Sequence, residues 1–93
     1  MRWLAEVRVT LRAGIADPEG QTIASALRSL GYAGVEEVRT GKLMRIAFAA
    51  ADHAAAVSAI DEMCRRLLAN PVMETATFEL RAEHQDADSA IPA

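Results

Sequence analysis

The stretch from Val35 to Phe48 constrains the fold most, because it predicts two strands joined by a tight turn at Thr40-Gly41-Lys42. Glycine readily adopts the positive φ that such a hairpin turn needs. After the turn, Leu43 to Ala49 has the period of two that is typical of a strand with one apolar face. A strand pattern and a helix pattern precede the hairpin, and a helix pattern and a strand pattern follow it. The hairpin therefore divides the chain into two strand–helix–strand units.

The first unit opens with a strand from Trp3 to Arg12, in which every second residue is apolar. The next segment predicts a helix, because Asp17 can cap its start, Pro18 suits its first position and Gly31 suits the residue after its end. The expected core face of the strand is Trp3, Ala5, Val7, Val9 and Leu11, and the apolar stripe of the helix is Ile23, Ala26 or Leu27, and Leu30.

The second unit contains a helix that starts after Asp52, the expected N-cap, and ends at Asn70-Pro71, because proline cannot continue it. A last strand is expected from Val72 to Arg81, with Ala76, Phe78 and Leu80 on one face. The apolar stripe of this helix comprises Val57, Ile60, Met63 or Cys64, and Leu67 or Leu68.

The order strand–helix–strand–strand–helix–strand predicts an α+β fold, the ferredoxin-like sandwich. It has a four-stranded antiparallel sheet with both helices on one face. Residues 1–82 form the single domain, whereas residues 83–93 are polar and aperiodic and predict a disordered tail. The outer face of the sheet mixes apolar and charged residues and suits a wet protein interface; it holds Leu4, Arg8, Leu43, Arg45 and Thr77.

Composition excludes several classes of function. The chain has 93 residues and a formal net charge of −3, without a cluster of basic residues, so nucleic acid is not expected as a ligand. No apolar run approaches the ~20 residues that span a bilayer, which argues against a membrane protein. A single cysteine cannot form an internal disulfide, and a cytoplasmic protein is expected. A domain this short buries a modest core, which favours completion by a partner.

The sequence shows no catalytic constellation. His53 lies at a helix start and His84 in the tail, and neither has a partner at metal-ligand spacing. Cys64 lies on or beside an apolar helix stripe and is expected to be a buried structural thiol. We therefore expect no active site, no metal and no cofactor on this chain.

Two short motifs are candidates for special roles. Gly20 stands in the first turn of a helix, where it costs about 1 kcal/mol relative to alanine, and this predicts a close approach to the helix start. Arg39 and Lys42 place two cations around the turn at Gly41. An ordinary solvated turn and a contact with an anion or partner both fit that arrangement.

Four stretches in order resemble PurS, the small subunit of phosphoribosylformylglycinamidine (FGAM) synthase. They are Asp17-Pro18-Glu19-Gly20, Leu30-Gly31-Tyr32, Val38-Arg39-Thr40-Gly41-Lys42 and Leu67-Leu68-Ala69-Asn70. The resemblance covers about residues 5–82. It departs from the family where Pro71 follows Asn70, in strand residues Arg45 and Ala47, and in the extra tail.

The resemblance implies a non-catalytic subunit that bridges a glutaminase subunit, PurQ, and a large synthetase subunit, PurL, and that supports ammonia transfer. ATP, Mg²⁺ and glutamine are used by these partners in the fourth step of de novo purine synthesis. The resemblance also implies a homodimer, with a dimer of dimers as the larger alternative. Arg39 and Lys42 are expected to contact a partner, and Asp17 and Gly20 to shape the helix start; the full set of motif residues is Asp17, Gly20, Tyr32, Arg39, Gly41 and Lys42.

The main alternative is a stand-alone regulatory module of the same topology that binds a small molecule. An acylphosphatase-like enzyme would need an anion-binding loop with an arginine and an asparagine, and the loop Ala13-Gly14-Ile15-Ala16 supplies neither. An RNA-binding sandwich would need stacking aromatic residues on two strands, and the strand after the hairpin offers only Phe48.

Overall fold

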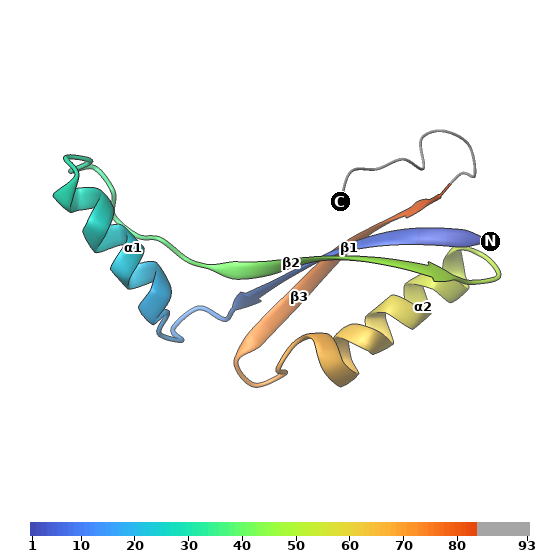
Figure 1. Ribbon diagram of the computed structural model, residues 1–93. Helices are drawn as coiled ribbons and strands as arrows, with labels where there is room; N and C mark the ends of the chain where they lie inside the picture. The colour runs from blue at the N-terminus through green and yellow to red at the C-terminus, as the bar shows by residue number, and fades with distance from the viewer. Residues whose placement is uncertain (84–93) are drawn as a thin grey trace.

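The computed structural model describes residues 1–83 as three strands and two helices, the second of which ends in a π-helical turn (Figure 1). Both helices begin at the predicted caps, since Asp17 and Asp52 each accept a backbone N–H bond from the first turn. In chain order the elements are β1 (Arg2–Leu11), α1 (Pro18–Ser29), β2 (Gly41–Ala49), α2 (His53–Met63), the π-helical turn (Cys64–Leu68) and β3 (Glu74–Ala82).

The sheet is antiparallel with the order β2-β1-β3, so the first strand is central. Val7 pairs with Met44 on one side and with Phe78 on the other, which brings the apolar faces of all three strands to the same side. The predicted core face of β1 is confirmed at four of its five positions, Trp3, Ala5, Val7 and Val9, which are almost fully buried. Leu11, at the end of the strand, is only half-buried.

α2 covers the apolar face of the sheet (Figure 1). Both alternatives at the third position of its stripe contact the core, since Cys64 is buried and Met63 packs against the core cluster. At the last position Leu68 packs against the core, whereas Leu67 is 83% exposed. The buried residues of the helix and its π-helical turn recur every four positions, at Ala56, Ile60 and Cys64.

The predicted hairpin is wrong. Residues 35–40 form neither helix nor strand and pair with no strand of the described chain, and β2 starts directly at Gly41. Gly41 has no positive φ, so the backbone does not reverse there. The predicted four-stranded sheet is consequently a three-stranded sheet within residues 1–83, because the predicted strand before the turn does not form.

The prediction that both helices cover one face of the sheet is also wrong for the single chain. α1 projects away from the sheet as an arm (Figure 1), and the core cluster of the described chain contains none of its residues. The Cα radius of gyration is 17.2 Å, whereas a compact domain of this length would have about 12 Å. We call residues 18–38, α1 and the segment that returns from it, the arm.

The described part of the chain ends at Glu83, just after β3. Glu83 is tied to the first strand, because its N–H donates to the carbonyl of Arg2 (2.9 Å) and its carboxylate pairs with the Arg2 side chain (3.0 Å). The rest of the predicted tail, residues 84–93, lies outside the described residues. Within the described part of the chain, neither helix has the length and apolar character that a membrane span requires.

Ile60→Ala should strongly destabilise the fold. Ile60 is fully buried under the sheet, and truncating such a side chain leaves a cavity that costs about 2–5 kcal/mol. Leu67→Ala is the matched control on the same helical stretch, and its free energy of unfolding should stay within about 0.5 kcal/mol of the parent. Chemical denaturation followed by circular dichroism at one protein concentration measures both; equal losses would contradict this packing.

Candidate functional site

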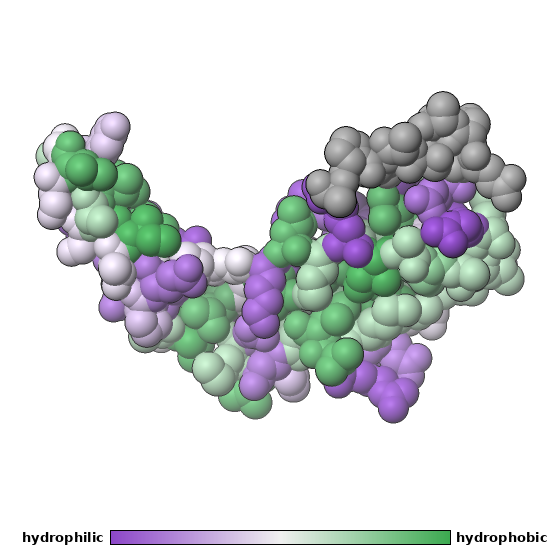
Figure 2. Space-filling view, in the orientation of Figure 1, coloured by the Kyte–Doolittle hydropathy of each residue, from purple (hydrophilic) through white to green (hydrophobic). Residues whose placement is uncertain are grey.

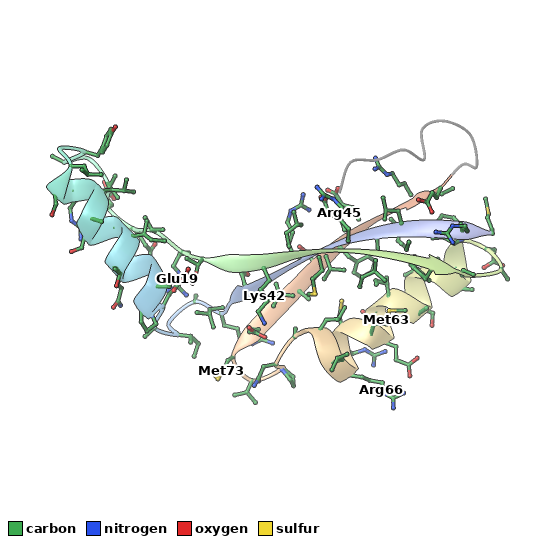
Figure 3. All side chains as sticks on the ribbon, in the orientation of Figure 1. Glu19, Lys42, Arg45, Met63, Arg66 and Met73 are labelled. Atoms are coloured by element: carbon green, nitrogen blue, oxygen red, sulfur yellow. The ribbon has the colours of Figure 1, made fainter. Side chains whose placement is uncertain are left out.

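The motif residues converge where the chain leaves the sheet for the arm and returns from it. We call this crossing the neck and define it as residues 12–17 and 39–41. The guanidinium of Arg39 donates to the carbonyl oxygen of Arg12 at 3.3 Å, which ties the returning segment to the outgoing one. Glu19 and Lys42 lie just beyond the neck, on the arm and on β2 respectively (Figure 3).

Asp17 is the centre of the neck. Its side chain is 97% buried and accepts hydrogen bonds from both chain segments. The N–H of Gly20 donates to it at 2.9 Å, as an N-cap requires. From the returning segment, the N–H of Thr40 donates at 2.6 Å and the Thr40 hydroxyl lies 2.9 Å and 3.0 Å from the two carboxylate oxygens. One carboxylate therefore joins the start of α1 to the start of β2.

The protonation state of Asp17 is coupled to this geometry. The hydrogen bond from the Thr40 N–H, followed by that from Gly20, lowers the pKa of the carboxyl below its ordinary 3.8, and burial opposes the shift. The nearby Arg39 charge lowers the pKa further. The neck is therefore built around an ionised carboxylate at neutral pH.

The close approach predicted at Gly20 is confirmed, and the approaching group belongs to the chain itself. A Cβ on Gly20 would collide with the carbonyl oxygen of Val38. Ala24, one turn further on, is also buried. This small-residue face of α1 packs on the returning segment. In the predicted stripe Ile23, Ala26 and Leu30 are exposed, and Leu27 is half-buried.

Gly41 has a different role from the one predicted. A Cβ at this position would lie 2.6 Å from the carbonyl oxygen of Val9, so glycine is needed for close approach to β1 and not for a turn. The Thr40 N–H, which a hairpin could use, is bound by Asp17 instead. Thr40 was predicted to lie in the turn because it precedes Gly41, and its bonds to Asp17 were not predicted.

The structure brings together five of the six predicted motif residues and leaves one apart. Asp17, Gly20, Arg39, Gly41 and Lys42 lie at or beside the neck. Tyr32 lies past the far end of α1, where its N–H closes a Schellman motif on the carbonyl of Leu27 (3.1 Å) and its side chain is 61% exposed.

Outside the neck, His53 and Cys64 are the side chains of catalytic type, and both pack against apolar residues. His53 packs edge-on against the ring of Trp3, with 5.5 Å between the centroids. Cys64 is buried, and burial, with the charge of Asp61, raises the pKa of its thiol above 9.0, which keeps it protonated and weakly nucleophilic at neutral pH. Residues 1–83 contain no group of three or more His, Cys, Asp or Glu side chains that could hold a metal ion.

Asp17→Asn should remove a pH-dependent part of the stability. The folded pKa is lowered, so the carboxylate bonds stabilise the folded state at pH above about 4 and this contribution is lost as the pH falls through the folded pKa. The difference in unfolding free energy between parent and variant should be largest near neutral pH and should shrink below about pH 4. Denaturant titrations across that range measure it.

Asp52→Asn is the matched control for that comparison. Asp52 caps α2 through one hydrogen bond, from the N–H of Ala55 at 2.8 Å, and joins no second chain segment. Its effect at neutral pH should be the smaller of the two. A deficit of Asp17→Asn that stays constant from pH 7 to pH 3 would show that the carboxylate charge is not what holds the neck.

Comparison with known proteins agrees with the motifs at the neck. The family model PurS, described as phosphoribosylformylglycinamidine (FGAM) synthase, matches residues 4–82. A PurS subunit from Synechocystis is 45% identical over 76 residues, which cover 82% of this chain and 76% of that protein. The PurS structure from Thermus thermophilus is 39% identical with a TM-score of 0.80, and covers 90% of this chain and 100% of its own.

A chain of the PurLQS structure from Thermotoga maritima is also similar to this protein. It is 29% identical, its TM-score is 0.75, and the match covers 89% of this chain and 99% of that one. The family model and the curated relative each span most of this sequence, and the likeness of structure extends over nearly the whole described chain. This chain therefore belongs to the PurS family.

Proposed function

We propose that this chain is the small, non-catalytic subunit of an FGAM synthase, and that it bridges the PurQ and PurL subunits. The observation that carries the proposal is the match to a chain of the Thermotoga maritima PurLQS structure. That match leaves out only 11% of this chain and 1% of the other, so the likeness is to a whole subunit. A subunit of this kind acts through the surfaces that bind its partners and not through an active site of its own.

In the proposed complex, the chemistry lies on the partners. PurQ releases ammonia from glutamine, PurL uses ATP and Mg²⁺, and this chain binds no cofactor and supports ammonia transfer in the fourth step of purine synthesis. The non-catalytic role is supported by the structural surroundings of three side chains of reactive types: Asp17 in the neck, His53 on Trp3 and Cys64 in the core. The proposal also includes a cytoplasmic location.

The proposed subunit is a homodimer in which the ferredoxin-like sandwich and its fourth strand are completed by a second copy. Two observations support association. The arm exposes large apolar side chains, with Leu30 74% exposed and Tyr32 61% exposed. Among residues 1–83 the sheet has two open edges, at β2 and β3, and unpaired edges are ready templates for another strand.

A reconstitution assay tests the bridging role. The chain is mixed with matching PurL and PurQ subunits, and amidine formation is measured with glutamine and, separately, with ammonia as nitrogen source. We expect the glutamine-dependent rate to require this chain, because only that reaction needs ammonia to pass between subunits. The ammonia-dependent rate of PurL should change little. If neither rate responds and no complex forms, the bridging role is wrong, and a ligand screen for the regulatory alternative follows.

A double substitution tests the proposed contact of Arg39 and Lys42 with a partner. Both side chains are exposed, and the neck loses only the 3.3 Å bond from Arg39 while it keeps the bonds to Asp17. Arg39→Ala with Lys42→Ala should therefore leave the fold intact and weaken complex formation about tenfold or more. The matched control is Arg65→Ala with Arg66→Ala, which removes the same charge from exposed sites after α2. Sedimentation with PurL and PurQ measures binding. Equal binding by the two double variants would remove Arg39 and Lys42 from the interface.

A further inference from the structure

β3 forms an open edge of the sheet. It lies on the other side of β1 from β2, and no strand of residues 1–83 pairs with its outer side (Figure 1). The strand that a ferredoxin-like sandwich would add to this sheet precedes β2 in sequence and belongs beside β2. The homodimer proposed above therefore does not cover the edge of β3.

The hydrogen bonds at the two ends of the β1–β3 ladder show which backbone groups of β3 point outward. The N–H of Glu83 donates to the carbonyl of Arg2 at 2.9 Å, and the N–H of Arg12 donates to the carbonyl of Met73 at 2.8 Å. In an antiparallel ladder, residues that bond to the neighbouring strand alternate with residues that do not. The N–H and C=O groups of four residues consequently point away from β1: Ala76, Phe78, Leu80 and Ala82.

The edge carries few of the features that usually keep an edge strand from pairing. Short length, lysine, proline and bulges are common among them. β3 has 9 residues, contains neither proline nor lysine, and pairs with β1 residue by residue without a bulge. The described chain therefore presents a regular row of unpaired backbone groups, which is what β-strand addition by an extended peptide segment requires.

Two opposite charges alternate along the outer face of this edge. Glu79 has a 75% exposed side chain, and its one ion pair within residues 1–83, with Arg8, is long at 3.8 Å. Arg81 is exposed and pairs with no carboxylate of the described chain. A hollow of about 210 Å³ over β1 and β3 is lined by both of these residues and by Leu4, Glu6 and Leu80. The edge can thus select a segment by charge as well as by its backbone.

The core side of β3 also favours an added strand. Phe78 and Leu80 pack against the core cluster but remain only half-buried. Apolar side chains of an adjacent strand would cover them further, since directly opposite residues of an antiparallel pair lie about 4.5–5.5 Å apart. Figure 2 shows hydrophilic and hydrophobic residues side by side over the body of the molecule. A partner at this edge has to match an alternating pattern, not one continuous apolar patch.

We propose that the edge of β3 binds an extended segment of another subunit of the proposed complex, as an added antiparallel strand. In this segment an acidic residue lies opposite Arg81, an apolar residue opposite Leu80 and a basic residue opposite Glu79. Opposite charges directly across such a pair stabilise it, and like charges destabilise it. The basic side chain can extend into the hollow over β1. Main-chain hydrogen bonds supply the affinity, and the alternation of side chains supplies the specificity.

A second copy of this chain is the wrong occupant on grounds of symmetry. The proposed homodimer already joins two copies around one two-fold axis. A second two-fold contact, at the edge of β3, would join dimer to dimer in an open row that does not close. A segment of a different subunit ends the sheet instead. This strand addition deepens the bridging role proposed above and rests on it.

Hydrogen exchange tests the added strand. The chain is exchanged alone and in the assembled complex with PurL and PurQ, then quenched and read residue by residue. The N–H groups of Phe78 and Leu80 should exchange at least about tenfold more slowly in the complex, because each gains a hydrogen bond. The N–H groups of Thr77 and Glu79 are the matched control and should change little, since they already point toward β1.

Other occupants give other exchange patterns. Protection of Phe78 and Leu80 in the isolated chain at every concentration would assign the edge to residues 84–93 and overturn the proposal. Protection that rises with the concentration of the chain alone would assign the edge to a second copy and overturn it too. A complex in which these groups still exchange freely would overturn it while leaving the bridging role intact, and the absence of any complex would overturn both.

Charge reversal at the edge gives a second test. Arg81→Glu should raise the dissociation constant of the complex about threefold or more, because an attraction across the strand pair becomes a repulsion. Arg66→Glu is the matched control, since it makes the same change of charge at an exposed side chain after α2. Circular dichroism checks that both variants fold, and sedimentation with PurL and PurQ measures binding. Equal dissociation constants for the two variants would contradict the charge pairing at Arg81.

Discussion

The carboxylate of Asp17 holds the structure in the shape that the rest depends on. It binds the first turn of α1 and the residue before β2 at the same time, so the segment that leaves the sheet and the segment that returns to it are held together at the neck. No core contact steadies the arm, since the core cluster of the described chain draws on β1, β2, β3, α2 and the turns after it. The buried carboxylate of Asp17, together with the Arg39–Arg12 bond, therefore fixes where α1 leaves the sheet.

Two glycines make this neck possible by removing side chains rather than by bending the backbone. Gly20 lets the carbonyl of Val38 approach α1, and Gly41 lets β2 approach the carbonyl of Val9. The positive φ values lie elsewhere, at Gly14 and Gly31, where the chain does turn. The Thr40 N–H thus donates to the Asp17 carboxylate and not to a backbone carbonyl of a hairpin.

Local signals in the sequence predicted the elements well and their arrangement poorly. The alternation in β1, both N-caps and the end of α1 at Gly31 were correct, because each depends on neighbours within a few residues. The hairpin at Gly41 and the docking of α1 on the sheet were wrong, because the periodicity of a segment does not specify which part of the molecule it packs on. At the neck, the motif residues were found but the role of Thr40 was missed, since nothing local connects it to Asp17 across 23 positions.

An extended chain of this size has an energetic reason to associate. Its buried hydrophobic set is small and includes three alanines, so little apolar area is removed from water by folding one copy alone. The arm and the edge of β2 hold apolar surface and backbone groups in reserve, and their burial can contribute only when another chain is present. In the proposed complex, folding and assembly would use the same surfaces, so the stability of the subunit would depend on its concentration and on its partners. That coupling would suit a subunit of the proposed kind, because these apolar surfaces and backbone groups are exposed in the single chain.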